Sequence, residues 1–257
     1  MKNDIFQPAR SSWEEYASKI GLQSVLDPND STGIKNQYID EIHKKAITRV
    51  ARLSPDSVIL DFGCGIGRIT KYLADRSAHI IGVDITHEML VKARNEAGNF
   101  NTNFLRIDGQ NLPIAANSVD LVVAVYVLQY GIMQCRVYQK ILQEFTRVLK
   151  SKGRLLMIEQ ASICGQKSGS VRKPIRLEAY LDFGHTVKYR LLNKCAIRLG
   201  KPRRLEQFTV LRRWFPSWLH PLGIRAILTR NMSLKKVSLI KQPYVDYLLY
   251  LEKRDAL

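Results

Sequence analysis

The stretch that most constrains the fold runs from Val58 to Arg68 and reads VILDFGCGIGR. An apolar run ends in an acid and passes directly into three glycines at alternating positions, Gly63, Gly65 and Gly67. Apolar residues then recur at helical spacing, so the pattern predicts a buried strand, a tight turn and the start of a helix. Glycines in such a turn let the chain bend sharply and let a ligand lie against the backbone. The free N–H groups at the start of the helix would face that ligand.

The glycine spacing differs from the G-x-G-x-x-G of a dinucleotide-binding loop, because the third glycine comes one residue early and Asp61 precedes the loop. The form Asp-x-Gly-x-Gly-x-Gly resembles motif I of the class I S-adenosylmethionine-dependent methyltransferases, in particular those that act on small molecules. The resemblance implies S-adenosyl-L-methionine as the cofactor. It also implies cofactor contacts in this loop, at Asp61, Gly63, Gly65, Gly67 and Arg68.

Two further motifs follow in the order that the resemblance implies. His79 to Asp84 reads as a buried strand ending in an acid, whose carboxylate can accept both hydroxyls of a ribose. Asn103 to Asp108 reads as a third strand, and a carboxylate and a backbone N–H there can bind an adenine. A fourth apolar strand follows over 119–128. The implied cofactor contacts in these segments are Asp84, Ile85, Asp108, Gly109 and Tyr126.

The remaining patterns predict an α/β fold, and the resemblance implies a Rossmann-like seven-stranded methyltransferase sheet. Apolar residues at every fourth position predict an amphipathic helix over 34–50. The resemblance implies that this helix closes over the cofactor, with Lys35 and Tyr38 as contacts or, for Tyr38, as packing alone. A helix over 136–150 and a strand over 154–159 complete the core. Two β-rich runs, 234–240 and 244–251, predict a terminal antiparallel hairpin.

We therefore expect one methyltransferase domain over 1–257. Its parts are a helical cap over 1–53, a cofactor-binding core over 54–160, a lid over 161–230 and the hairpin over 231–257. Helical stripes are expected in the lid, one of them formed by Val187, Leu191, Cys195 and Leu199. The lid would cover the carboxyl ends of the strands, where ligands of open α/β sheets bind.

The net charge of +17 is unevenly distributed. Residues 1–160 hold 20 Lys and Arg against 17 Asp and Glu, whereas residues 161–257 hold 20 against 6, a net charge of +14. This basic half indicates an anionic acceptor, a membrane surface or a nucleic acid, although runs of charge are often only solvated faces. Its densest part spans Arg198 to Arg213.

Composition also indicates the compartment. The longest apolar run has eight residues, from Leu121 to Leu128, which is too short to cross a bilayer, and the first residues do not resemble a signal peptide. The four cysteines are widely spaced, which favours free thiols over disulfides or a zinc site. We expect a cytoplasmic protein without a metal, with peripheral membrane contact through the basic lid as an option.

The resemblance implies methyl transfer by in-line displacement, in which positioning supplies most of the catalysis. An oxygen acceptor of high pKa also needs a general base, for which Glu159 and His185 are the candidates, although either could be an ordinary polar residue. No Asn/Asp-Pro-Pro-Tyr/Phe motif of N-methylating enzymes is present, which favours an oxygen or small-molecule acceptor. The leading hypothesis is O-methylation of a small, lipid-linked or nucleotide-linked anionic acceptor. The alternatives are an RNA methyltransferase, with nucleic acid the less favoured partner, and a noncatalytic binding protein.

Overall fold

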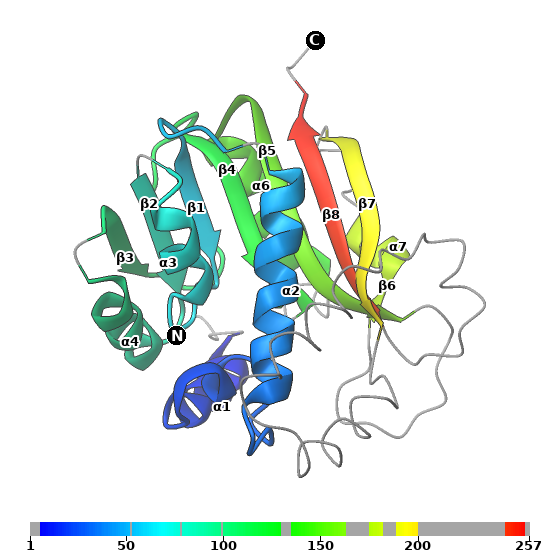
Figure 1. Cartoon of the computed structure of the whole chain (residues 1–257). Helices are drawn as coiled ribbons and strands as arrows, with labels where there is room; N and C mark the ends of the chain where they lie inside the picture. Colours follow the sequence, from blue (N-terminus) through cyan, green and yellow to red (C-terminus); the bar gives the residue numbers. More distant parts are fainter. Residues whose placement is uncertain are drawn as a thin grey trace.

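The computed structural model describes residues 6–51, 53–77, 79–98, 100–129, 135–162, 175–181, 189–199 and 245–254. Over these residues, seven strands form one mixed sheet in the order β3–β2–β1–β4–β5–β8–β7 (Figure 1). The strands are β1 Val58–Phe62, β2 His79–Asp84, β3 Thr102–Arg106, β4 Val119–Val125, β5 Leu149–Ser162, β7 Tyr189–Leu199 and β8 Val245–Lys253. The short strand β6, Ile175–Arg176, pairs with β5 beside this path.

The direction of the strands matches the predicted fold class. Strands β1 to β5 run parallel to one another, and β8 runs antiparallel to both β5 and β7. The strand order reverses beside β1, because the chain first builds outward through β2 and β3 and then returns to add β4 on the other side. Ligands of open α/β sheets bind in the crevice at the carboxyl ends of the strands at such a reversal.

Helices cover both faces of the sheet (Figure 1). On one face, α2 Ile34–Val50 and α3 Arg68–Ala74 bury Ile47, Ile69 and Leu73. On the other, α6 Cys135–Val148 and α7 Leu177–Leu181 pack against alternate strand residues such as Leu60 and Phe62. This division follows from the alternation of side chains along a strand. The other helices are α1 Gln7–Ala17, the 3₁₀-helix η1 Gly21–Ser24 and α4 His87–Ala97, which packs beside α3.

The helix expected from the stripe of Val187, Leu191, Cys195 and Leu199 was wrong over the described residues, because Tyr189–Leu199 form strand β7. The stripe that suggested the helix has a spacing of four, which fits a helical face but also fits one face of a strand, where every second residue points the same way. Pairing with β8 decides between the two, from Tyr189 opposite Lys253 to Leu199 opposite Val245. Part of the segment that we expected in the lid therefore belongs to the sheet.

The terminal antiparallel pair is present, but with a different partner strand. Strand β8 confirms the second of the two predicted runs, and its antiparallel neighbours are β5 and β7. The first run, 234–240, lies outside the described residues. Across the part of the chain that the structure describes, none of the helices combines the length and the apolar character needed to cross a membrane.

Candidate active site

A cleft opens at the carboxyl ends of β1, β2 and β4, where the strand order reverses. Its empty volume is about 930 Å³, part of which is open to solvent, and this lies at the upper end of the range for small-molecule sites. Most of the predicted cofactor contacts line it: Asp61, Gly63, Gly65, Arg68, Asp84, Ile85, Gly109 and Tyr126. The sequence motifs, which are up to 65 residues apart, therefore meet in one cleft.

The glycine loop is held against the ends of the two neighbouring strands, β2 and β4. The N–H groups of Gly63 and Cys64 both donate to the carbonyl of Val83, at 2.8 and 3.0 Å. Gly63 has a φ of +71°, and a Cβ there would lie 2.4 Å from a methyl carbon of Val127. Only glycine meets both conditions without a shift of the backbone. The loop can therefore approach β4 closely and leave the space above it open.

Asp84 joins the loop to the end of β2. One of its carboxylate oxygens accepts a hydrogen bond from the Gly65 N–H and the other from the Thr86 N–H, both at 2.9 Å. The side chain is half-buried at the cleft wall. Burial raises the pKa of Asp84 above its ordinary value, although these two N–H donors act to lower it. A carboxylate has about four acceptor positions, so Asp84 retains capacity for ligand hydroxyls.

Asp61 is buried under the loop, with an exposed fraction of 2%. It accepts a hydrogen bond of 2.6 Å from the Thr70 hydroxyl on α3. Burial raises the pKa of Asp61 to about 6, although the Thr70 bond and the positive charge of Arg68 both act to lower it. The contact fixes the angle between β1 and α3, so the carboxylate supports the loop as well as lining the cleft.

Gly67 and Asp108 lie beside the cleft and not in its wall. A Cβ on Gly67 would lie 3.1 Å from the Cβ of Ala93, so this glycine allows α3 and α4 to pack closely. Asp108 is exposed and accepts hydrogen bonds from the N–H groups of Gln110 and Asn111, at 2.8 and 2.7 Å. Slight burial raises the pKa of Asp108, but these bonds outweigh it and leave the pKa lowered. Cofactor contact by these two residues stays a prediction.

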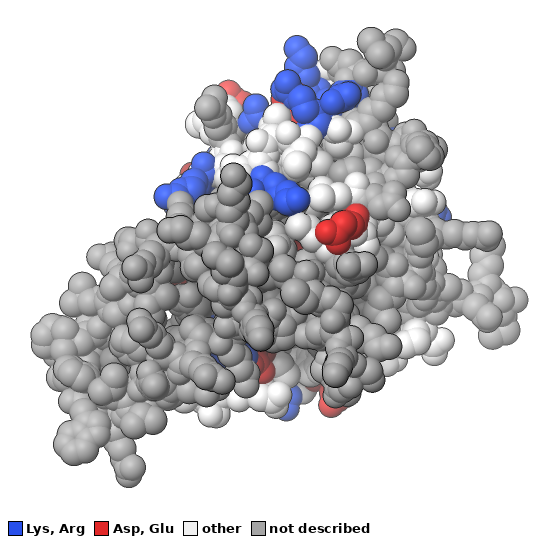
Figure 2. All heavy atoms as spheres, turned by 90° about the vertical axis from the view of Figure 1, so that its right-hand side faces the viewer, with Lys and Arg blue, Asp and Glu red and all other residues white. Residues whose placement is uncertain are grey.

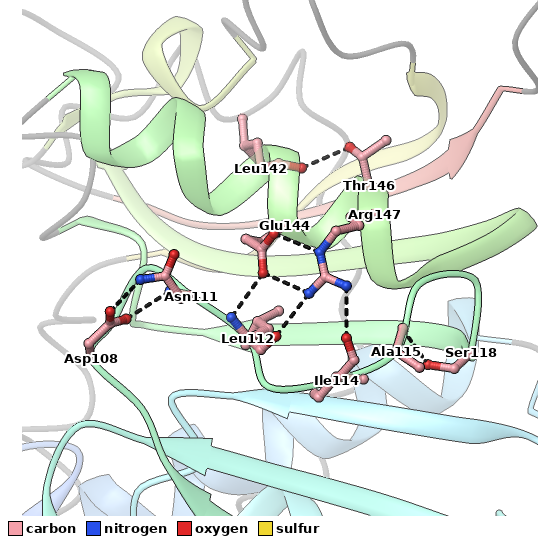
Figure 3. A network of polar contacts seen from close by, with 10 residues as sticks. All are labelled: Asp108, Asn111, Leu112, Ile114, Ala115, Ser118, Leu142, Glu144, Thr146 and Arg147. Atoms are coloured by element: carbon pink, nitrogen blue, oxygen red, sulfur yellow. Dashed lines mark hydrogen bonds and ion pairs between the residues drawn. The ribbon is translucent and has the colours of Figure 1, made fainter.

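The segment after β3 is held in place by α6 (Figure 3). The guanidinium of Arg147 donates to the carbonyl oxygens of Leu112 and Ile114, at 2.9 and 2.8 Å. Glu144 accepts the Leu112 N–H at 2.9 Å. These side-chain contacts replace the backbone pairing that a strand would supply, and they fix the segment that carries Gly109 to the cleft.

The N-terminal segment covers part of the cleft. Phe6, Ala9 and Trp13 line it, and the ring of Phe6 lies against Gly109. Lys92 on α4 donates to the carbonyls of Ala17 and Lys19 and so fastens the end of α1. The two residues suggested as cofactor contacts in α2 lie elsewhere. Lys35 forms an ion pair with Asp27, and Tyr38 is buried in a cluster with Ile39 and Ile42.

Of the two candidate bases, Glu159 is buried beneath the chain segment that follows β4. Its Oε1 atom accepts the N–H groups of Val127 and Leu128, at 2.9 and 2.8 Å. Burial raises the pKa of Glu159 to about 8, and the negative charge of Asp246 acts in the same direction. Glu159 is not among the residues that line the cleft, so its role as a base stays a prediction. His185, the other candidate, lies outside the described residues.

Sequence reasoning missed three buried polar residues behind the cleft, Asp40, His43 and Asp246. Arg68 donates to Asp40 Oδ1 at 2.9 Å and lies 3.2 Å from His43 Nδ1. The hydroxyl of Tyr126 donates to Asp246 at 2.5 Å. The sequence held a signal for two of them, because Asp40 and His43 are polar residues three positions apart on the apolar face of the predicted helix. Among the residues described, no three His, Cys, Asp or Glu side chains gather as a metal site.

Comparison with known proteins agrees with this geometry. Residues 59–153 match the family of methyltransferase domains. These residues form a class I S-adenosylmethionine-dependent methyltransferase domain. The chain is 26% identical over 179 residues to phosphoethanolamine N-methyltransferase 1 of Zea mays, covering 67% of the chain and 33% of that relative. It is 29% identical over 136 residues to demethylmenaquinone methyltransferase of Tropheryma whipplei, covering 52% and 55%. The chain therefore spans about a third to half of the length of these relatives.

Solved structures share the fold of this chain. The phosphoethanolamine N-methyltransferase 1 of Haemonchus contortus, in complex with phosphoethanolamine and S-adenosylhomocysteine, superposes with a TM-score of 0.68 at 16% identity. The match covers 100% of this chain and 51% of that one. Geranyl diphosphate C-methyltransferase from Streptomyces coelicolor superposes with a TM-score of 0.63 at 12% identity, covering 98% and 99%.

Proposed function

We propose that the protein transfers a methyl group from S-adenosyl-L-methionine to a small or carrier-linked anionic acceptor, with oxygen as the favoured acceptor atom. The observation that carries the proposal is the position of Asp84. Its carboxylate is anchored to the glycine loop and to α4 through the N–H groups of Gly65 and Thr86 and keeps acceptor capacity at the cleft wall. This is the geometry that a ribose with two free hydroxyls requires.

The residues around Asp84 fit the rest of the cofactor. The apolar side chains of Ile85, Met89 and Ile107 line the cleft near the end of β2, which suits the flat face of an adenine. Gly63 and Gly65 leave backbone exposed for the chain of the cofactor. When bound, S-adenosylmethionine supplies an electrophilic methyl group on a positively charged sulfur. The carboxylates of Asp61 and Asp84 give this part of the cleft a favourable potential for that charge.

The residues of the chain would act mainly by orientation. Holding cofactor and acceptor in line makes the transfer effectively unimolecular, which is worth about 7–11 kcal/mol in well-oriented systems. The covering residues Phe6 and Trp13 would exclude water from the cleft. An oxygen acceptor would also lose a proton during the transfer, for which Glu159 and His185 are the candidate bases.

The anionic character of the acceptor is supported by two lines of argument. The names of two related proteins contain the phosphate-bearing compounds phosphoethanolamine and geranyl diphosphate. In addition, residues 161–257 of this chain carry a net charge of +14. Lys and Arg side chains bind phosphate strongly, and arginine can do so through two parallel hydrogen bonds.

The positive charge that the structure does describe lies mostly away from the cleft. Figure 2 shows the side of the molecule that carries β7 and β8, with lysines and arginines gathered at the end where β7 begins and β8 ends. Arg190 and Arg254 are exposed there, and Arg190 pairs with Glu252 at 2.6 Å. Inside the cleft, the charge of Arg68 is already balanced by Asp40. We therefore propose that the basic segment over Arg198–Arg213 binds the phosphate of the acceptor. The protein would then act in the cytoplasm, either free or at a membrane surface.

An assay of the full chain tests the proposal. The protein is incubated with S-adenosylmethionine and, separately, with phosphoethanolamine, geranyl diphosphate, demethylmenaquinone and a mixed RNA, and the formation of S-adenosylhomocysteine is measured. We expect turnover with a phosphate-bearing small acceptor, and mass spectrometry of the product shows whether the methyl group lies on oxygen, as proposed, or on nitrogen or carbon. Turnover with RNA alone would favour the RNA methyltransferase that the excess of positive charge also suggests. Failure to bind the cofactor would contradict both functions.

A further inference from the structure

Two residues of the cleft wall are connected behind it through buried polar side chains. Arg68, at the start of α3, and Tyr126, just after β4, both line the cleft. The connection runs through His43 on α2 and Asp246 on β8, and both have an exposed fraction of 0%. Arg68 Nη2 lies 3.2 Å from His43 Nδ1, His43 Nε2 lies 3.8 Å from Asp246 Oδ2, and that oxygen accepts the hydroxyl of Tyr126 at 2.5 Å.

The donor capacities of these groups fix the protonation of His43. A guanidinium has only N–H donors, so His43 Nδ1 must be the acceptor in its contact with Arg68. A neutral imidazole then carries its proton on Nε2, which faces the carboxylate of Asp246. The ring therefore presents an acceptor to a cation and a donor to an anion. Either contact favours this tautomer.

Tyr126 is held in an uncommon backbone conformation at the same place. Its φ of +58° lies in the left-handed region, which a bulky side chain rarely adopts. The conformation is fixed by the Tyr126 N–H, which donates to the Ile158 carbonyl at 2.9 Å, and by the hydroxyl contact with Asp246. The ring of His43 also meets the Tyr126 ring edge-on, with centroids 4.8 Å apart. Strain of this kind persists where the surroundings over-determine it, and it gathers at functional sites.

We propose that His43 is a positioning residue that sets two walls of the cleft, Arg68 directly and Tyr126 through Asp246. The inference rests on the proposed function for the identity of the ligand that these walls contact. A second proton on His43 would remove the acceptor for Arg68 and place two cations next to each other. Arg68 would then lose one of its two anchors and keep only Asp40. Ligand affinity should therefore fall as His43 becomes protonated.

Several charged groups bear on this equilibrium. From other elements, Arg68 on α3, Tyr126 after β4 and Asp246 on β8 face the ring of His43 directly. Behind them, Asp40 on α2 pairs with both Arg68 and Lys44. Glu159 on β5 acts on Asp246, and Asp61 on β1 acts on Arg68. Asp61 titrates near pH 6, so its contribution must be separated from that of His43. A variant that lacks only the imidazole does this.

The test is calorimetric titration of the full chain with S-adenosylhomocysteine between about pH 5.5 and about pH 8, the range over which histidine titrates. The variants are His43→Asn, whose amide oxygen can replace the Nδ1 acceptor without titrating, and His43→Leu, which cannot. His79→Asn is the matched control, because this histidine lies at the amino end of β2, away from the cleft. Thermal unfolding checks that each variant folds.

We expect the affinity of the wild-type protein to be about five- to twentyfold weaker at the acidic end than at the neutral end, as for the loss of one charge-assisted hydrogen bond. His43→Asn should keep only the part of this fall that Asp61, Asp84 and Glu159 cause, because their pKa values are also raised. At neutral pH it should bind about tenfold more tightly than His43→Leu. His79→Asn should follow the wild-type profile.

A change at Asp246 adds a result that a purely structural role would not produce. The carboxylate favours the charged form of the histidine that faces it, so Asp246→Asn should move the midpoint of the pH profile to lower pH by about half a unit or more. If His43→Leu does not fold, His43→Asn and Asp246→Asn still carry the test. If the pH profiles of these variants coincide with that of the wild type, the inference about His43 is overturned and the proposed function still stands. A wild-type protein that does not bind S-adenosylhomocysteine would overturn the proposed function, and the inference with it.

Discussion

Glu144 accepts two hydrogen bonds from Arg147, one turn further along α6, at 2.7 and 2.8 Å. The hydrogen bond from Arg147 is the largest cause of the lowered pKa of Glu144, which slight burial would otherwise raise. The pair also binds the backbone of Leu112 and Ile114, so it holds the segment after β3 and, with it, Gly109 at the cleft (Figure 3).

Replacing Arg147 should loosen this segment. In Arg147→Met, the carbonyls of Leu112 and Ile114 lose their donors and the Glu144 carboxylate loses its partner. We expect the free energy of unfolding to fall by about 1–2 kcal/mol, because the side chain is about a third exposed and solvent screens part of the interaction. Hydrogen exchange over 108–118 should become faster.

A surface ion pair provides the control for this change. Lys71 and Glu96 lie 3.1 Å apart, and both side chains are at least half exposed. Lys71→Met should change the free energy of unfolding by less than about 0.5 kcal/mol. The pair of Glu144 and Arg147 does not hold the segment if both variants lose the same free energy of unfolding. The same conclusion follows if hydrogen exchange over 108–118 is unchanged in Arg147→Met.

The buried carboxyl of Glu159 should make stability depend on pH. Its pKa of about 8 in the folded protein lies above its ordinary value of 4.5, so the folded state binds this proton more tightly than the unfolded state does. The resulting stabilisation is complete below about pH 4.5 and is lost as the pH rises through about 8. In Glu159→Gln, this loss, on the order of a few kcal/mol, should disappear from chemical denaturation measured across that range.

The same variant examines Glu159 as a general base. The glutamine keeps an oxygen for the N–H groups of Val127 and Leu128, so the segment after β4 should retain its conformation. With an oxygen acceptor and Glu159 as the base, turnover should fall by about a hundredfold or more while the affinity for the cofactor holds. Unchanged turnover would mean that Glu159 only supports the segment after β4 and is not the base. The turnover of His185→Asn would then test the other candidate.

The basic segment separates the proposed function from its alternatives. The four arginines that this test changes lie outside the described residues, so the prediction rests on charge alone. Reversing Arg203, Arg204, Arg212 and Arg213 to glutamate should abolish turnover of a phosphate-bearing acceptor and change cofactor affinity by less than about twofold. Loss of binding to anionic vesicles would instead indicate a lipid-linked acceptor, and loss of salt-dependent RNA binding the RNA alternative. Wild-type behaviour in every assay would make the segment a solubilising surface only.

The core of the fold could be predicted from the sequence because its signals are local. The apolar run before Asp61 and the alternating glycines after it determine strand, turn and helix within a few residues, and the acid that ends β2 follows the same logic. Strand β7 could not be predicted in this way. The spacing of Leu191, Cys195 and Leu199 fits both a helix and a strand, and only pairing with β8, about 50 residues later, decides between them.

The candidate site was predictable to the same extent. The residues that line the cleft come from motifs whose chemistry is visible in the sequence, such as Asp84 and Gly65. The buried group of His43 and Asp246 is not visible there, because it depends on contact between α2 and β8, elements about 200 residues apart. A polar residue on an apolar helical face, as at His43, shows only that a partner must exist, since burial of an unpaired polar group is costly.

The most direct test of the account is the affinity of the full chain for S-adenosylhomocysteine, measured by calorimetry for the wild type and for Asp84→Ala. The account predicts micromolar binding to the wild type and a loss of about 1.5–3 kcal/mol in the variant, the cost of removing a charged hydrogen-bond acceptor. Asp56→Ala, an exposed carboxylate in the turn before β1, should bind as the wild type does. NAD should not bind. Comparable affinity for NAD, or equal binding of S-adenosylhomocysteine by the wild type and Asp84→Ala, would contradict the account.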